Sequence, residues 1–208
     1  MPANMGSVER KQRLKEDVRC KILEAGWNIV EEEGWSALSM RKIADAIEYT
    51  APIIYGHFES KDALLTEFTR KGHMVLSFKV KTACEKHETA EAQLEALWLA
   101  YWDFAFEQPA YYKLMYGVEM NCCECEVAEC PEYVSASKQA LNLINELIAR
   151  SNQPDQDAER RFYTFWAIVH GLISLNMVQK DSQNKLSDEF NRTILNDAIK
   201  GIIRTILQ

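Results

Sequence analysis

The scarcity of residues that interrupt helices most constrains how this chain folds. Its 208 residues include only 8 glycines and 5 prolines, so long stretches contain no residue that breaks regular structure. A β-sandwich or barrel needs a turn every 8 to 12 residues or so, which this sequence does not supply. Apolar residues make up 47% of the chain, enough for a packed core. The sequence therefore predicts an all-α fold.

Apolar residues recur at helical spacing along most of the chain, and the breaks between these segments are short and polar. Ser39, Thr50 and Ser60 are each placed to cap the helix that follows, and Gly34 is placed to end the first one. The expected helices span about residues 16–33, 40–47, 51–58, 60–86, 91–106, 109–116, 133–150, 158–179 and 187–207.

The net charge of −7 argues against a nucleic-acid binder until it is divided along the chain. Residues 1–71 carry 11 Lys+Arg and 12 Asp+Glu, whereas residues 72–208 carry 13 and 19. The segment from Arg10 to Lys21 holds six basic residues against Glu16 and Asp17. A local positive patch thus lies in a nearly neutral N-terminal part.

Two short capped helices separated by a tight turn follow this basic segment. A helix-turn-helix has this arrangement and lays its second helix in the major groove of DNA. We expect the helix-turn-helix at about residues 39–58, inside an N-terminal domain of three helices.

The residues of this motif resemble the DNA-binding domain of the tetracycline-repressor (TetR) family of bacterial regulators. The resemblance covers about residues 16–64 and rests on Gly34-Trp35-x-x-Leu38-Ser39-Met40-x-x-Ile43-Ala44-x-x-Ile47-x-Tyr49-Thr50-x-Pro52-x-Ile54-Tyr55-x-His57-Phe58-x-Ser60-Lys61-Asp62-x-Leu64. Glu48 departs from the pattern, because the family usually has glycine at this turn. A residue with a Cβ and a positive φ there costs about 1 kcal/mol, so either the turn relaxes or the strain is tolerated.

The resemblance implies which side chains meet DNA. Thr50 and Lys61 are similar to the phosphate contacts of the family, which suit a hydroxyl or an ammonium at a helix start. Tyr55 and His57 are similar to its aromatic pair, which reaches a phosphate or a base edge, while Phe58 fits a core position. Ala51, Pro52 and Ile53 are expected to face the groove with apolar surface suited to thymine methyl groups. Arg41 and the Arg10 to Lys21 arm are expected to add positive charge near the DNA backbone.

Aromatic residues are concentrated between positions 98 and 166, which is typical of a large aromatic core, of a ligand cavity, or of both. Two short segments, Pro109–Tyr116 and Trp166–Leu172, resemble a TetR-family ligand-binding domain of the Trp…His-Gly type. Gly171 is expected to permit a close helix crossing, and His170 fits a packed core histidine better than a ligand contact. The candidate effector pocket comprises Trp98, Trp102, Tyr112, Tyr116, Phe165, Trp166 and His170.

Four cysteines, Cys122, Cys123, Cys125 and Cys130, lie within nine residues among glutamates. They could bind a soft metal or form a disulfide on oxidation. Their spacing is poor for structural zinc, and the neighbouring carboxylates raise thiol pKa values. A merely cysteine-rich loop and a metal- or thiol-redox-sensing site both remain open, and no cofactor is expected.

These observations favour a ligand-responsive transcriptional regulator, most simply a repressor released from a palindromic operator by a small molecule. We find no paired acid and base, glycine-rich phosphate loop or nucleophile motif, so the sequence does not indicate an enzyme. The expected domains are residues 16–76, which bind DNA, and residues 77–208, a helical bundle for effector binding and dimerisation. The resemblance implies a homodimer through the last two helices. No export signal or membrane span is evident, which favours the cytoplasm.

Overall fold

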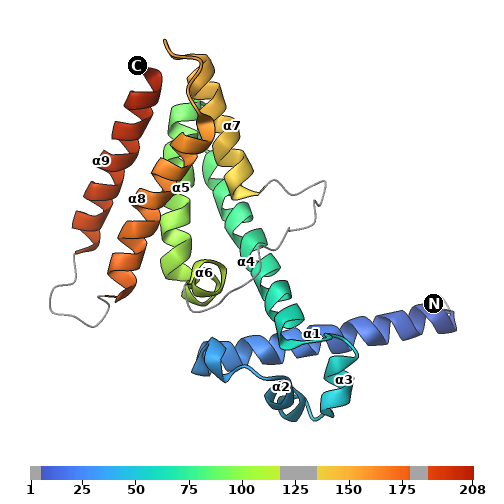
Figure 1. Cartoon of the computed structure of the whole chain (residues 1–208). Helices are drawn as coiled ribbons and strands as arrows, with labels where there is room; N and C mark the ends of the chain where they lie inside the picture. Colours follow the sequence, from blue (N-terminus) through green and yellow to red (C-terminus); the bar gives the residue numbers. More distant parts are fainter. Residues whose placement is uncertain (1–5, 118–134, 179–186) are drawn as a thin grey trace. The chain divides into compact units, whose positions relative to one another are not determined.

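The computed structural model describes residues 6–117, 135–178 and 187–208, and these residues form helices and connecting turns without a strand (Figure 1). The chain divides into two compact units. Of the described residues, the first unit contains 6–69 and 113–117, and the second contains 70–112, 135–178 and 187–208. Helix α4 (Lys61–Cys84) carries the chain from the first unit into the second. None of the described helices is both long and apolar enough to cross a membrane.

The first unit packs short helices against one long helix. It contains α1 (Ser7–Glu33), a 3-10 turn at Trp35–Ala37, α2 (Met40–Ala46), α3 (Ala51–Tyr55) and the first turns of α4. Each of the helices contributes at least one side chain that is fully or almost fully buried: Ile22, Ile43, Ile54, Leu64 and Phe68. This common core fixes the position of α3 within the unit.

A cluster of three aromatic rings joins α1 to α4 inside the first unit. The Trp35 ring meets the Trp27 ring at 6.1 Å and the Phe68 ring at 5.4 Å, both edge to face. Gly26 makes room for this cluster, because a Cβ at this position would lie 3.2 Å from the Phe68 ring. No pattern in the sequence predicts this cluster, because its rings come from separate elements.

The local signals at helix ends are confirmed at three of the four positions. Ser39 Oγ accepts a hydrogen bond from Lys42 N at 3.2 Å, and Ser60 Oγ accepts one from Ala63 N at 3.0 Å. Gly34 ends α1 with a φ of 83°, which favours glycine. The expectation for Thr50 was wrong in one respect: it occupies the N-cap position of α3, but its side chain makes no cap hydrogen bond.

The second unit is a helical bundle in which α5 (Ala90–Glu107) packs against α7 (Ala136–Ala149), α8 (Ala158–Val178) and α9 (Asp188–Leu207) (Figure 1). Helix α6 (Pro109–Tyr116) follows α5 directly. Ion pairs from Arg192 to Asp103 at 2.7 Å and from Lys200 to Glu95 at 3.4 Å hold α9 beside α5.

Most helix bounds agree with the expected ones within a few residues, and α1 is the main exception. It begins at Ser7, whereas the apolar pattern predicted a start at about residue 16. Residues 9–15 are strong helix formers without an apolar stripe, so periodicity alone could not reveal them. Helix α3 ends at Tyr55, earlier than predicted, and the backbone turn continues with a hydrogen bond from Phe58 N to Ile54 O at 3.0 Å.

Candidate nucleic-acid interface and effector region

Helix α3 has one buried and one exposed face. Ile54 is 0% exposed and anchors the helix to the core, whereas Ile53 and Tyr55 are 41% and 51% exposed. Pro52 is also exposed, and it sits in the first turn of the helix, where a missing N–H is tolerated. The exposed face therefore presents apolar and phenolic surface that can enter a DNA groove.

The turn that precedes α3 contains a strained residue. Glu48 has a φ of 59°, the left-handed region that favours glycine. Tyr49 N donates a hydrogen bond to Ala44 O at 2.9 Å, and this bond closes the C-terminal end of α2 around Glu48. The strain considered for Glu48 is thus tolerated and the turn does not relax.

The side chains predicted to reach phosphates or bases lie around α3 and at the ends of its neighbours. Arg41 and Thr50 are exposed, and Lys61, at the start of α4, is half-buried. Because the Thr50 hydroxyl does not cap α3, it is available to an external acceptor. Ala51 is half-buried on the first turn of α3. Their roles as DNA contacts remain predictions.

His57 lies just after α3 and is half-buried. Its Nδ1 atom is buried and has no hydrogen-bond partner in the described part of the chain. Burial, followed by the positive charges of Lys15 and Arg19, lowers the pKa of His57 below 6.5. The imidazole is therefore neutral at pH 7 and beside two cations from α1.

The predicted effector residues of the second unit gather into one aromatic cluster, with two exceptions. Trp98 stacks on Phe165 with ring centroids 5.4 Å apart, and Trp166 stacks on His170 at 4.9 Å. The exceptions are Trp102, which packs against Phe106 at 4.8 Å, and Tyr116, which belongs to the other unit. The cluster also contains Tyr101 and Phe162, which were not among the predicted effector residues and whose rings lie 5.9 and 5.8 Å from that of Trp98.

A chain of hydrogen bonds runs through this cluster. Trp166 Nε1 donates to Tyr101 Oη at 3.2 Å, and Tyr101 bonds to Tyr112. The Tyr112 hydroxyl lies 2.5 Å from Nδ1 of His170. Burial raises the pKa of Tyr112 to about 12 and lowers that of His170 below 6.5. Near pH 7 the hydroxyl is protonated and the imidazole neutral, so Tyr112 can donate to His170.

One polar atom in the cluster has no partner. Trp98 is 2% exposed, and its Nε1–H makes no hydrogen bond in the described part of the chain. A buried donor without an acceptor is unfavourable by about 1–3 kcal/mol. A molecule that entered the cluster could satisfy this donor with an oxygen atom.

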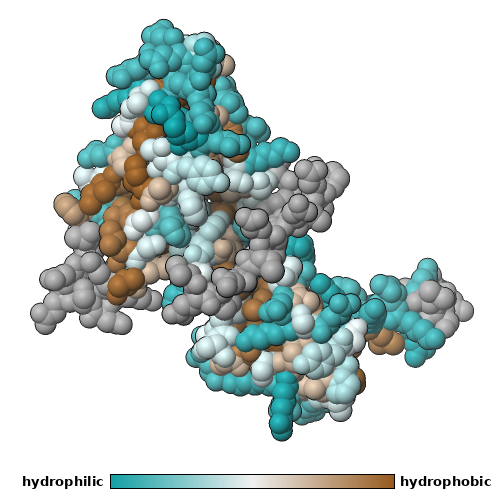
Figure 2. Space-filling model, in the orientation of Figure 1, coloured by the Kyte–Doolittle hydropathy of each residue, from teal (hydrophilic) through white to brown (hydrophobic). Residues whose placement is uncertain are grey.

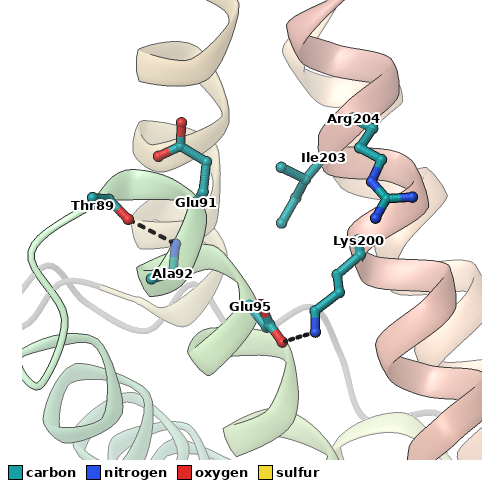
Figure 3. A pocket seen from close by; sticks show the side chains of 7 residues that line it. All are labelled: Thr89, Glu91, Ala92, Glu95, Lys200, Ile203 and Arg204. Carbon is teal, nitrogen blue, oxygen red and sulfur yellow. Dashed lines mark hydrogen bonds and ion pairs between the residues drawn. The ribbon is translucent and has the colours of Figure 1, made fainter.

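A separate hollow of about 270 Å³, with both charged and apolar lining residues, lies between the first turns of α5 and the C-terminal half of α9 (Figure 3). The Glu95–Lys200 ion pair joins α5 to α9 at this hollow, as Figure 3 shows, and Glu91 pairs at 3.1 Å with Arg150, the C-cap residue of α7. No pattern in the sequence predicts this hollow, because its walls are ordinary surface residues of two helices. Its lining residues are Thr89, Glu91, Ala92, Glu95, Lys200, Ile203 and Arg204.

The four cysteines considered as a metal or redox site, Cys122, Cys123, Cys125 and Cys130, lie outside the described residues. Among the residues that are described, no group of three or more His, Cys, Asp or Glu side chains is placed to hold a metal. Cys84 is buried, and burial raises the pKa of its thiol to about 11, so this side chain is unreactive at pH 7.

Comparisons with known proteins agree with this architecture. The family model for bacterial regulatory proteins of the tetR family matches residues 22–68, and the tetracyclin repressor-like C-terminal domain model matches residues 94–193. The uncharacterized HTH-type transcriptional regulator Rv0681 of Mycobacterium tuberculosis is 24% identical over 177 residues, which cover 82% of this chain and 74% of that protein.

Two solved structures show the same fold. A transcriptional regulator of the TetR/AcrR family from Thermobifida fusca has a TM-score of 0.61 and 20% identity, over 89% of this chain and 98% of that one. The fatty acid degradation regulator FadR from Bacillus halodurans has a TM-score of 0.59 and 18% identity, over 99% of this chain and 97% of that one.

The fold and the exposed face of α3 define a helix-turn-helix regulator with a helical C-terminal domain. With family models matching both parts, the chain belongs to the TetR family of transcriptional regulators.

Proposed function

We propose that this regulator is a repressor that binds a palindromic DNA operator as a homodimer and is released by a small-molecule effector. Residues 16–76 would bind DNA, and residues 77–208 would bind the effector and dimerise. The single observation that carries the DNA-binding part is α3: a short helix, anchored by the fully buried Ile54, that turns Ile53 and Tyr55 to solvent. Two copies one helical turn of DNA apart, about 34 Å, would read the two half-sites.

The proposed DNA contacts divide by role. Thr50 and Lys61 would hold phosphates at the starts of α3 and α4, with Arg41 adding backbone charge. The exposed face of α3 and the residues beside it would lie in the major groove, where Tyr55 and His57 reach polar groups. This groove set comprises Ala51, Pro52, Ile53, Tyr55 and His57.

The effector would enter the aromatic cluster of the second unit. The support is the unpartnered Trp98 Nε1–H among stacked rings, a setting suited to a flat or apolar molecule that carries one acceptor oxygen. The hollow between α5 and α9 is lined mainly by charges and suits such a molecule less well.

A binding experiment tests the DNA-binding part. We would select a preferred duplex from random-sequence DNA with the full chain and measure its affinity at several salt concentrations. Lys61→Ala should weaken binding and lower the salt slope by about one unit, since one phosphate contact is lost. Tyr55→Ala should weaken binding to the selected duplex more than to random duplexes. Lys138→Ala, an exposed lysine on α7, is the matched control. Unchanged affinity for both variants would contradict the proposal.

A further inference from the structure

Arg19 of α1 makes two contacts within the first unit, each to a different part of the chain. Its guanidinium lies 5.1 Å from the centroid of the Phe58 ring, a distance at which a cation is attracted to an aromatic face. The same group pairs with the Glu67 carboxylate of α4 at 3.2 Å. Phe58 is the third residue after the end of α3, so Arg19 joins α1, the turn that follows α3 and the first turns of α4.

These contacts are largely shielded from solvent. The side chains of Arg19 and Glu67 are 31% and 12% exposed, and Phe58 is 5% exposed. A partly buried ion pair is screened less by water and salt than a pair on the surface. Burial, followed by the charges of Lys15 and Arg19, lowers the pKa of His57, the residue before Phe58. Arg19 therefore acts at the C-terminal end of the recognition helix.

Helix α3 depends on such contacts because it is short. It has five residues, of which only Ile54 is buried. A helix of this length makes few backbone hydrogen bonds of its own, so tertiary contacts set its orientation. Phe58 provides a second anchor: its N–H donates to Ile54 O at 3.0 Å, and its ring is buried. The Arg19 guanidinium lies over this second anchor.

We propose that Arg19 is a positioning residue for DNA recognition: by joining Phe58 to Glu67 it holds the end of α3 in place on α4, without itself contacting a phosphate. This inference rests on the proposed function, because it needs α3 to bind DNA. It differs from the role expected for the Arg10 to Lys21 arm, which is to add charge near the DNA backbone. If the end of α3 is released, fewer molecules are ready to bind, and the apparent dissociation constant rises in proportion.

Glu67 makes this role distinguishable from an effect of charge. Removal of a carboxylate from a DNA-binding domain strengthens binding when only charge matters, because repulsion of the phosphates falls. If Glu67 holds Arg19, Glu67→Ala should weaken binding instead. Alanine is the best helix former, so α4 stays helical. Glu24→Ala, at an exposed acidic residue of α1, is the matched control and should bind equally well or slightly more tightly.

We would measure the affinity of the full chain for the selected duplex at several salt concentrations, after determining the active fraction by stoichiometric titration. Arg19→Ala should bind about tenfold more weakly and Glu67→Ala about threefold, both with the wild-type salt slope, since no phosphate contact is lost. Lys61→Ala provides the reference for a slope lower by about one. The double variant Arg19→Ala/Glu67→Ala should bind about as weakly as Arg19→Ala alone, because both changes break the same connection.

Two conservative variants keep the test decisive if an alanine variant does not fold. Arg19→Lys retains the positive charge, and Glu67→Gln retains a hydrogen-bond acceptor. Each should lose less affinity than the corresponding alanine variant, and the salt slope should stay that of the wild type. Circular dichroism and urea denaturation would measure the fold of every variant.

A salt slope lower by about one in Arg19→Ala would overturn the proposal, because Arg19 would then contact a phosphate. Unchanged or tighter binding by Glu67→Ala, or additive losses in the double variant, would also overturn it. Lower stability with unchanged affinity of the folded fraction would do the same, since the ion pair would then be purely structural. In each of these results a preferred duplex is still selected, whereas failure of the proposed function selects none.

Discussion

Glu48 occupies the turn between α2 and α3 with a φ of 59°, a conformation in which its Cβ crowds the backbone. Replacement by glycine should relieve this strain and raise the free energy of unfolding by about 1 kcal/mol. Glu48→Ala keeps the Cβ and should give no such gain, which makes it the matched control. Urea denaturation measures both variants, and equal stability of the glycine and alanine variants would contradict the explanation.

The lowered pKa of His170 predicts how the free energy of unfolding changes at acidic pH. Because burial lowers this pKa below 6.5, the folded state binds fewer protons than the unfolded chain. The stability contributed by neutral His170 is therefore present above about pH 6.5 and is lost as the pH falls towards the folded-state pKa. Protonation also places a hydrogen on Nδ1, where the Tyr112 hydroxyl donates.

We expect the free energy of unfolding to decline below about pH 6.5 and to decline less steeply in His170→Gln. His57 and His73 also have lowered pKa values, so only the difference in slope between variant and wild type isolates His170. Urea titrations at intervals from about pH 7.5 to 5 would measure it. Parallel pH profiles would rule out a contribution from His170.

At the scale of elements, a buried amide pair fixes α8 against α9. Asn176 Nδ2 donates to Asn191 Oδ1 at 3.0 Å, and Asn191 Nδ2 donates to Asn176 Oδ1 at 2.7 Å. Both residues are at most 4% exposed. Two reciprocal bonds can form only in one register of the two helices, so the pair specifies how they align.

Asn176→Leu should destabilise the chain by about 2 kcal/mol, because the Asn191 amide is left buried without this partner. The double variant Asn176→Leu/Asn191→Leu should recover much of that loss, since neither helix then carries an unsatisfied amide. Guanidinium denaturation of the single and double variants measures the coupling. Additive losses would show that the two amides do not act as a pair.

At the scale of the whole molecule, α8 and α9 carry apolar side chains that their own unit leaves exposed. Ile168, Leu175 and Val178 on α8 and Phe190 on α9 are 39%, 57%, 87% and 53% exposed, and Figure 2 shows apolar atoms gathered along these two helices. Homodimers are typical of the family, and a second copy placed here would cover this surface. Leu172, Ile199 and Ile206 on the same two helices are core residues and do not belong to this surface.

Gly171 lies on the same face of α8 as Ile168, Leu175 and Val178 by helical spacing. The expected close helix crossing at this glycine is wrong for the described part of the chain, where a Cβ on Gly171 would meet no atom within 4 Å. Gly171→Leu should therefore leave the subunit folded and weaken the dimer, as judged by circular dichroism and sedimentation at micromolar concentration. Glu159→Leu, an exposed α8 position on another face, should stay dimeric. A dimeric Gly171→Leu would place the interface elsewhere.

The sequence by itself determined the helical class and the helix-turn-helix. These features depend on contacts a few residues apart: the Ser39 and Ser60 caps, the Gly34 stop and the apolar spacing that buries Ile54. Such features can be predicted from the sequence because the free backbone groups at a helix end are satisfied by residues only a few positions away.

Only the tertiary structure decided which distant side chains meet. Tyr112 and His170 are 58 residues apart, and Trp166 and Tyr101 are 65 apart, so their hydrogen bonds follow from how the helices pack rather than from any spacing in the chain. The same holds for Arg19: its charge is evident in the sequence, but only packing brings its guanidinium 5.1 Å above the ring of Phe58. Helical periodicity fixes which residues share a face, and packing decides what that face meets.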